Sequence, residues 1–214
     1  MRNNESTGSA ASAASAASAA SAASAASETS DASQGTEEFN VDVLIEIPLG
    51  SNHKYEKCKK TGLLRCDRIL HSPYVYPFNY GYFPNTLAGD GDELDALVVT
   101  KYPLIPNSLI ECKIIEVLKT RDEKGCDDKI ICVPVSRVDP EFREVTDYKD
   151  LKQSEVDMIE YFFRTYKNRE YKKFVDIIGF AGAYSAKELY KQSQIDFCKA
   201  RELPAKPINI TKTI

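Results

Sequence analysis

Histidine is scarce in this sequence of 214 residues, and the common metal and nucleophile motifs are missing. His53 and His71 are the only histidines, so neither a catalytic triad nor a metal site built from several histidines is well supplied. The six cysteines form no C-x-x-C pair and no zinc-finger spacing, and we interpret them as reduced thiols rather than zinc or redox sites. Neither G-x-S-x-G nor a P-loop occurs, which argues against serine hydrolases and P-loop nucleotide hydrolases.

Long apolar runs and an excess of basic residues are also missing. No run is long enough to span a bilayer, and residues 1–38 contain no apolar segment typical of a secretory signal peptide. Lys and Arg total 28 against 32 Asp and Glu, a net charge of −4, whereas nucleic-acid-binding proteins usually carry a basic surface. We therefore expect a cytoplasmic protein with no membrane partner and no nucleic-acid partner.

The N-terminal segment is of low complexity. Residues 9–27 are six Ser-Ala-Ala repeats and a closing Ser27, which cannot bury enough apolar surface to offset the entropy of ordering. We predict a disordered tail over 1–38, with organelle targeting as the alternative, although Arg2 is the only arginine before residue 40. The folded catalytic domain is expected over 39–203, followed by a loose tail over 204–214.

The rest of the chain predicts an α+β fold, a small β-barrel with two flanking helices. Strands are expected over 41–47, 96–100, 109–118, 129–135 and 174–180, with a hairpin formed by 53–57 and 63–67. The proline- and tyrosine-rich segment 74–84 predicts an irregular loop instead of a central strand.

Two helices are expected late in the chain. Ser154-x-x-Asp157 resembles a capping box, and inward positions follow at helical spacing in residues 156–166. Ser185 opens the second helix, in which Leu189, Ile195 and Cys198 are expected to face inward.

An acidic stretch provides the first functional indication. Asp90, Asp92 and Asp95 fall within six residues, directly before the apolar run of residues 97–99. Acids crowded at the start of a buried strand repel one another and are costly to desolvate. A divalent cation that prefers oxygen ligands, such as Mg²⁺, would remove that cost. The alternative is a solvated Asp-Gly turn, because both residues are common in turns.

Other charged residues are consistent with a metal site. Glu46 interrupts an apolar strand, so its carboxylate should face a cleft and have a partner. Asp122 and Asp127 lie in a polar loop that, alone, is typical of a solvated hairpin. Basic residues fall at the ends of predicted elements, at Lys54, Arg68, Lys129 and Lys167. Together these residues predict a site for a polyanion held by metal ions, with Arg, Lys and Tyr binding the remaining oxygens.

Six stretches resemble the motifs of one enzyme family, in the family's order. They are Ile45–Pro48, Lys54–Glu56, Asp67-Arg68 with Tyr76–Tyr82, Asp90–Ala96, Asp122–Lys129 and Tyr166-Lys167. Over about residues 40–200 the chain resembles the family I soluble inorganic pyrophosphatases. The D-G-D-x-x-D signature is specific in this context, whereas Lys-Tyr-Glu alone is not. The Ser/Ala tail has no counterpart in the family pattern, and Glu93 stands where bacterial members often carry proline.

The resemblance implies an OB-like barrel, often in a homo-oligomer, that hydrolyses inorganic pyrophosphate to two phosphates. Several Mg²⁺ ions per site are implied, with Mn²⁺ or another divalent ion as the alternative. The implied metal ligands are Asp90, Asp92, Asp95, Asp122 and Asp127, with Glu46 and Glu56 acting through water or a weaker metal. Asp92 would also accept the proton of the attacking water. The implied ligands of pyrophosphate and phosphate are Lys54, Arg68, Tyr80, Lys129, Tyr166 and Lys167.

Two other functions remain as alternatives. A non-catalytic OB-type module could stack bases of a nucleic acid, or bind polyphosphate, through tyrosines such as Tyr74 and Tyr80. The net negative charge and the buried position expected for Glu46 argue against it. A degenerate pyrophosphatase kept as a scaffold is also disfavoured, because each acid and base of the family pattern is present.

Overall fold

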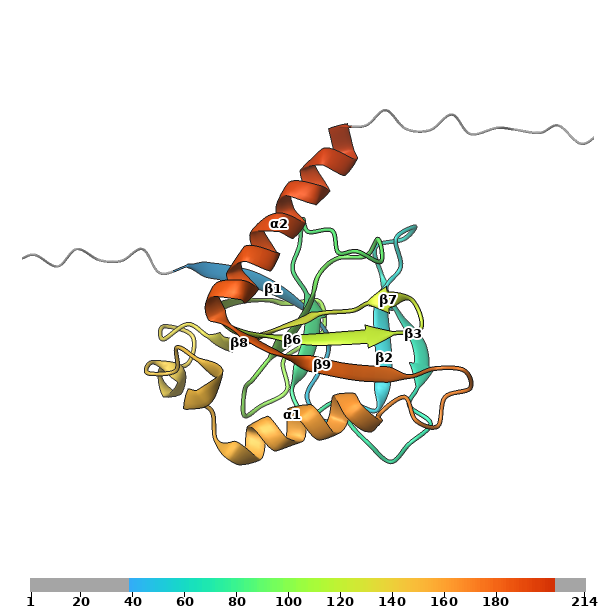
Figure 1. Ribbon diagram of the computed structural model, residues 1–214, viewed down its shortest axis with the longest axis horizontal. Coiled ribbons are helices and arrows are strands. Elements are labelled where there is room, and N and C mark those ends of the chain that lie inside the picture. The colour runs from blue at the N-terminus through green and yellow to red at the C-terminus, as the bar shows by residue number, and fades with distance from the viewer. Residues whose placement is uncertain (1–38, 203–214) are drawn as a thin grey trace, which may run out of the picture. The chain divides into compact units, whose positions relative to one another are not determined.

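The structure is a computed structural model that describes residues 39–202 (Figure 1). The predictions for the tails, 1–38 and 204–214, lie outside this range. The strands are β1 Asn40–Ile47, β2 His53–Lys57, β3 Leu64–Ile69, β4 Asn79–Tyr82, β5 Asp95–Val98, β6 Leu109–Asp122, β7 Gly125–Cys126, β8 Lys129–Pro134 and β9 Val175–Gly182. The helices are α1 Gln153–Thr165 and α2 Ala183–Glu202, with two short 3₁₀ turns, η1 Pro140–Phe142 and η2 Tyr148–Asp150.

Five strands form a closed ring. The order is β1-β4-β5-β8-β6, and β1 also pairs with β6, which joins the two ends. The first half of β1 pairs with β6, from Asn40 opposite Lys113 to Leu44 opposite Leu109, and its second half pairs with β4. The α+β class is confirmed, and the closing pair gives the five-stranded ring that a small OB-like barrel requires.

Two apolar clusters hold the ring between the helices. Alternate residues of β5 belong to different clusters, with Leu97 in the first and Ala96 and Val98 in the second. The first cluster includes the inward residues of α1, and the second includes Ala186 of α2. Figure 1 shows the two helices on different sides of the strands. Both faces of β5 are therefore covered, which explains its uninterrupted apolar sequence.

The prediction of an irregular loop over 74–84 is wrong for residues 79–82. These residues form β4, a fully buried strand between β1 and β5. Pro77 and Pro84 lie outside the strand, so neither removes a donor from the sheet. Gly81 allows the close approach of β1, because a Cβ atom there would lie 1.9 Å from the carbonyl oxygen of Leu44.

The helices are confirmed, but some of their details are not. Helix α1 is capped two residues earlier than predicted, because the Glu155 carboxylate accepts a hydrogen bond from the Lys152 N–H at 3.0 Å. Ser154 and Asp157 therefore do not form the predicted capping box. The expected inward face of α2 is wrong beyond its first half, because Ile195 is 47 % exposed and Cys198 is exposed. The helix shifts from the barrel towards solvent there, which residue type alone does not reveal.

The six cysteines, all within 39–202, are free thiols, and Cys112 and Cys132 are buried in strands as small apolar residues. Neither helix of the described region combines the length and apolar character needed to cross a membrane.

Candidate active site

A single cavity of about 700 Å³ brings the predicted site residues together. It opens beside the ring, between the β2–β3 hairpin, the loop that precedes β5 and the end of α1. Its lining contains every residue that the sequence predicted for the site: Glu46, Lys54, Glu56, Arg68, Tyr80, Asp90, Asp92, Asp95, Asp122, Asp127, Lys129, Tyr166 and Lys167. Segments far apart in the sequence therefore meet in one place.

Lys129 joins two of the acids. Parallel pairing of β5 with β8 places Asp95 opposite Lys129. The Lys129 ammonium donates hydrogen bonds to Asp95 Oδ2 at 2.8 Å and to Asp127 Oδ1 at 2.7 Å, and its side chain is only 2 % exposed. Burial alone would lower the pKa of Lys129, but the two carboxylates outweigh it and raise that pKa. Lys129 is therefore a permanent cation in the wall of the cavity.

Asp122 is paired with the lysine that follows α1. Lys167 Nζ donates to Asp122 Oδ2 at 2.7 Å, and both side chains are buried. Burial would raise the pKa of Asp122, but the hydrogen bonds from Lys167 and from the Lys124 N–H lower it below its usual value. Burial has the opposite outcome at Asp127, whose pKa it raises with help from the nearby Asp95, although Lys129 opposes the shift.

Glu46 faces the cavity from a β-bulge. Ile45 pairs with Gly81 and Ile47 with Tyr80, so Glu46 is the extra residue of β1 opposite β4. Its carboxylate accepts a hydrogen bond from the Lys57 N–H at 2.7 Å. Burial, aided by the charges of Asp95 and Glu56, raises the pKa of Glu46 to about 7. The prediction that this acid lies in a cleft and has a partner is confirmed.

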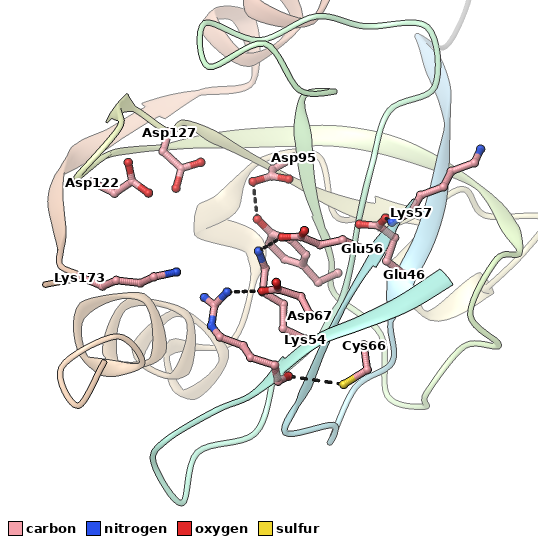
Figure 2. A network of polar contacts seen from close by, with 12 residues as sticks. Glu46, Lys54, Glu56, Lys57, Cys66, Asp67, Asp95, Asp122, Asp127 and Lys173 are labelled. Atoms are coloured by element: carbon pink, nitrogen blue, oxygen red, sulfur yellow. Dashed lines mark hydrogen bonds and ion pairs between the residues drawn. The ribbon is translucent and has the colours of Figure 1, made fainter. Parts of the chain in front are cut away.

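Basic and phenolic groups face these acids from the hairpin and from β4. Lys54 lies opposite Arg68 in the β2–β3 pair, and its ammonium contacts Glu56. Arg68 donates from Nη1 to Asp67 at 2.5 Å and from Nε to Glu170 at 2.9 Å. Figure 2 shows the carboxylates of Asp95, Asp122 and Asp127 along one side of the space and Lys173 pointing into it.

Two buried tyrosines, Tyr80 and Tyr166, line the cavity close to the acids. The Tyr80 hydroxyl donates to Asp95 Oδ2 at 2.5 Å. Both rings are buried, which raises the pKa of each hydroxyl well above its usual value, and the nearby carboxylates add to the shift. Both hydroxyls therefore stay protonated and can donate hydrogen bonds to anionic oxygens.

The acidic loop between β4 and β5 is held by backbone contacts. The Leu87 N–H donates to the carbonyl of Ser193 in α2 at 2.9 Å, and the Ala88 N–H donates to the carbonyl of Asp92 at 2.8 Å. Gly91 turns the chain with a φ of 87°, and the Asp92 N–H donates to Asp90 Oδ1 at 3.1 Å. The Asp92 side chain is about half exposed, and its carboxylate accepts a hydrogen bond from Lys59 at 2.6 Å.

Comparison with known proteins identifies the family. The sequence profile of the Pyrophosphatase family, described as inorganic pyrophosphatase, matches residues 43–197. The chain belongs to the inorganic pyrophosphatase family. An inorganic pyrophosphatase of Nanoarchaeum equitans is 48 % identical over 159 residues, which cover 74 % of this chain and 98 % of the relative. That of Sulfolobus acidocaldarius is 47 % identical over 147 residues, covering 69 % of this chain and 85 % of the relative.

A solved structure extends the comparison to the fold. The inorganic pyrophosphatase of Helicobacter pylori superposes with a TM-score of 0.73 at 38 % identity, over 74 % of this chain and 94 % of that one. As in other members of the inorganic pyrophosphatase family, dependence on a divalent metal is expected.

The carboxylate oxygens of the cavity are suitable ligands for a divalent cation. Within residues 39–202, no three His, Cys, Asp or Glu side chains gather closely enough to form a ready metal cluster. The charged partners of Asp95, Asp122 and Asp127 are lysine ammonium groups. Carboxylate oxygens are nevertheless the ligands that Mg²⁺ prefers. The raised pKa values of Asp127 and Glu46 mark negative charge that a bound cation would stabilise.

Four charged residues in or next to the cavity were not predicted as site residues: Lys59, Asp67, Glu170 and Lys173. Lys59, Asp67 and Lys173 line the cavity. Glu170 is buried and holds Arg68 across 102 positions of sequence. Asp67 adjoins Arg68 and could have been included on that ground. The other three stand in polar segments where a single charged residue is usually a solvated one.

Proposed function

We propose that this chain hydrolyses inorganic pyrophosphate to two phosphates in the cavity described above, with Mg²⁺ as the preferred metal. The observation that carries the proposal is the meeting of all the predicted acids and bases in one cavity. The family membership supports it, because the relatives named above are inorganic pyrophosphatases.

The basic side of the cavity suits the substrate. Pyrophosphate resists hydrolysis because its negative oxygens repel a nucleophile. Lys54 and Arg68 on the hairpin, with Lys167 after α1, present cationic donors to such oxygens, and the protonated Tyr80 and Tyr166 add neutral donors. Neutralising charge on the transferred and leaving phosphates is the main protein contribution to phosphoryl transfer.

The acidic side suits the water. The carboxylates of the cavity would hold the divalent ions, which would lower the pKa of a bound water from about 15.7 towards neutrality and neutralise phosphate charge. Asp92 is the acid that we assign to accept the proton of that water, because its lysine partner, Lys59, is exposed, whereas the lysines that engage Asp95, Asp122 and Asp127 are buried. Lys129 in turn fixes the orientations of Asp95 and Asp127.

The test is phosphate release from pyrophosphate by the full chain, with and without Mg²⁺. We expect no release in excess EDTA and recovery when Mg²⁺ is restored. Asp92→Asn should lower kcat by roughly two to four orders of magnitude, the scale for loss of a general base. Asp42→Asn is the matched control, because Asp42 is exposed on β1 outside the cavity. Near-normal turnover by Asp92→Asn would remove Asp92 from this role.

The proposal also covers the oligomeric state, the compartment and the partners of the chain. We propose a cytoplasmic homo-oligomer that needs neither a nucleic acid nor a membrane. The net charge of −4 supports the absence of a nucleic-acid partner. Light scattering coupled to size exclusion measures the oligomeric state. A monomer with full activity would contradict this part of the proposal alone.

A further inference from the structure

Lys59 connects the two sides of the cavity mouth. It lies in the turn between β2 and β3, strands that form a two-stranded sheet separate from the main sheet. Its ammonium donates hydrogen bonds to Asp92 Oδ1 at 2.6 Å and to the carbonyl of Gly91 at 3.4 Å. The hairpin that carries Lys54 and Arg68 is therefore tied to the loop that carries Asp92.

This contact differs from the other lysine–acid contacts of the cavity. Lys129 and Lys167 are buried beside their carboxylates, whereas the Lys59 side chain is 69 % exposed. Within the described residues, Lys59 is also the only basic side chain that forms an ion pair with Asp90, Asp92 or Glu93. It is thus an exposed cation at an acidic loop that, within the described residues, forms no ion pair with a buried one.

An exposed ion pair is easily exchanged. Such pairs contribute little to stability, because solvent screens them and ordering two side chains costs entropy. A divalent ion that binds Asp92 would compete with the ammonium 2.6 Å away for the same oxygens. A displaced Lys59 would remain at the mouth, where an arriving phosphate offers several negative oxygens.

We propose that Lys59 is a positioning residue that holds Asp92 in the metal-free chain and passes to the pyrophosphate oxygens once a metal ion occupies Asp92. The inference rests on the proposed function, since it names pyrophosphate as the second partner. It makes two predictions of opposite sign for removal of the ammonium: tighter metal binding and weaker substrate binding.

The experiment compares full-length Lys59→Met, Lys59→Arg and Lys60→Met with the unmodified chain. Lys60 is a matched control, because it is exposed in the same turn but does not line the cavity. Mn²⁺ binding is measured without substrate from the electron paramagnetic resonance signal of the free ion. KM and kcat for pyrophosphate are measured at saturating Mg²⁺, and the melting temperature confirms folding.

We expect Lys59→Met to bind Mn²⁺ about two- to fivefold more tightly, the scale of an exposed ion pair. Its KM for pyrophosphate should rise by a similar factor, with a smaller change in kcat. Lys59→Arg should stay near the unmodified chain in both measurements, and so should Lys60→Met.

Unchanged or weaker Mn²⁺ binding by Lys59→Met would overturn the proposal, and so would an unchanged or lower KM. Equal effects in Lys60→Met would also overturn it, because they would show a general effect of surface charge. The Mn²⁺ measurement needs no turnover. A chain that fails to hydrolyse pyrophosphate would therefore disprove the proposed function and the proposed contact of Lys59 with pyrophosphate. Mn²⁺ binding would still show whether Lys59 competes with a metal ion for Asp92.

Discussion

The Arg68 side chain is preorganised for binding an anion. Its Nε and Nη1 are occupied by Glu170 and Asp67, so the guanidinium is fixed in direction. Glu170 is the more buried partner, with a side chain 3 % exposed, and Lys173 lies 3.7 Å from the same carboxylate. A fixed guanidinium loses less entropy when it binds phosphate oxygens.

Glu170→Gln should therefore weaken substrate binding more than it slows the reaction. The amide keeps the shape but loses the charge-assisted hydrogen bond to Arg68. We expect KM for pyrophosphate to rise about fivefold to tenfold and kcat to change less, by steady-state phosphate release. Glu144→Gln, at an exposed position outside the cavity, is the control. A fall in kcat at constant KM would show that Glu170 does not position Arg68 for binding.

Among single residues, the sequence correctly predicted which motif residues would lie at the cavity. The acids of the Asp90–Ala96 stretch and the basic residues at element ends line one cavity, as predicted. Glu170 and Lys59 could not be found in this way, because each acts through a partner distant in the sequence and has no motif of its own. The roles assigned to the motif residues stay predictions.

Strand β4 is the element on which the ring depends. It lies between β1 and β5 and carries Tyr80 into the cavity. The flanking prolines obscured it in the sequence, since a local pattern does not show whether a proline falls inside or just outside a strand. Strands β6 and β8 were predictable because both are rich in β-branched and other apolar residues, whereas the exposed end of α2 was not.

Gly81→Ala should destabilise the fold severely. Its Cβ would lie 1.9 Å from the Leu44 carbonyl oxygen and 2.9 Å from the Ile45 Cα, and these backbone atoms can move only if β1 and β4 separate. We expect a loss of roughly 3 kcal/mol or more in the free energy of unfolding, measured by urea denaturation. Gly89→Ala is the control, because nothing lies within 4 Å of its added Cβ. Equal stability of the two variants would contradict the close approach.

For the whole molecule, the family match separates a catalytic unit from the segments around it. The profile covers residues 43–197, and the Nanoarchaeum equitans relative is matched over 98 % of its own length by 74 % of this chain. That relative thus has almost nothing in addition to the matched unit. The Ser-Ala-Ala repeats precede it and lie outside the described residues.

Removal of residues 1–38 should therefore leave hydrolysis intact. We expect kcat and KM of a chain beginning at Phe39 to stay within about twofold of the full chain, because no described residue of the cavity is removed. Phosphate release and melting temperature are measured on both chains side by side. A tenfold loss of activity at equal melting temperature would assign the repeats a part in catalysis.

The double pairing of β1 has a consequence for biosynthesis. Asn40 lies opposite Lys113 in the pairing of β1 with β6, so β1 is synthesised well before the strand with which it pairs. Contacts between such distant residues slow folding, because a long loop must close before they form. Glu46 on β1 and Asp122 at the end of β6 can consequently come together only after β6 has been synthesised. The cavity of a growing chain is incomplete until the five-stranded ring has formed. We therefore expect catalysis to begin only after β1 of the nascent protein has paired with β6.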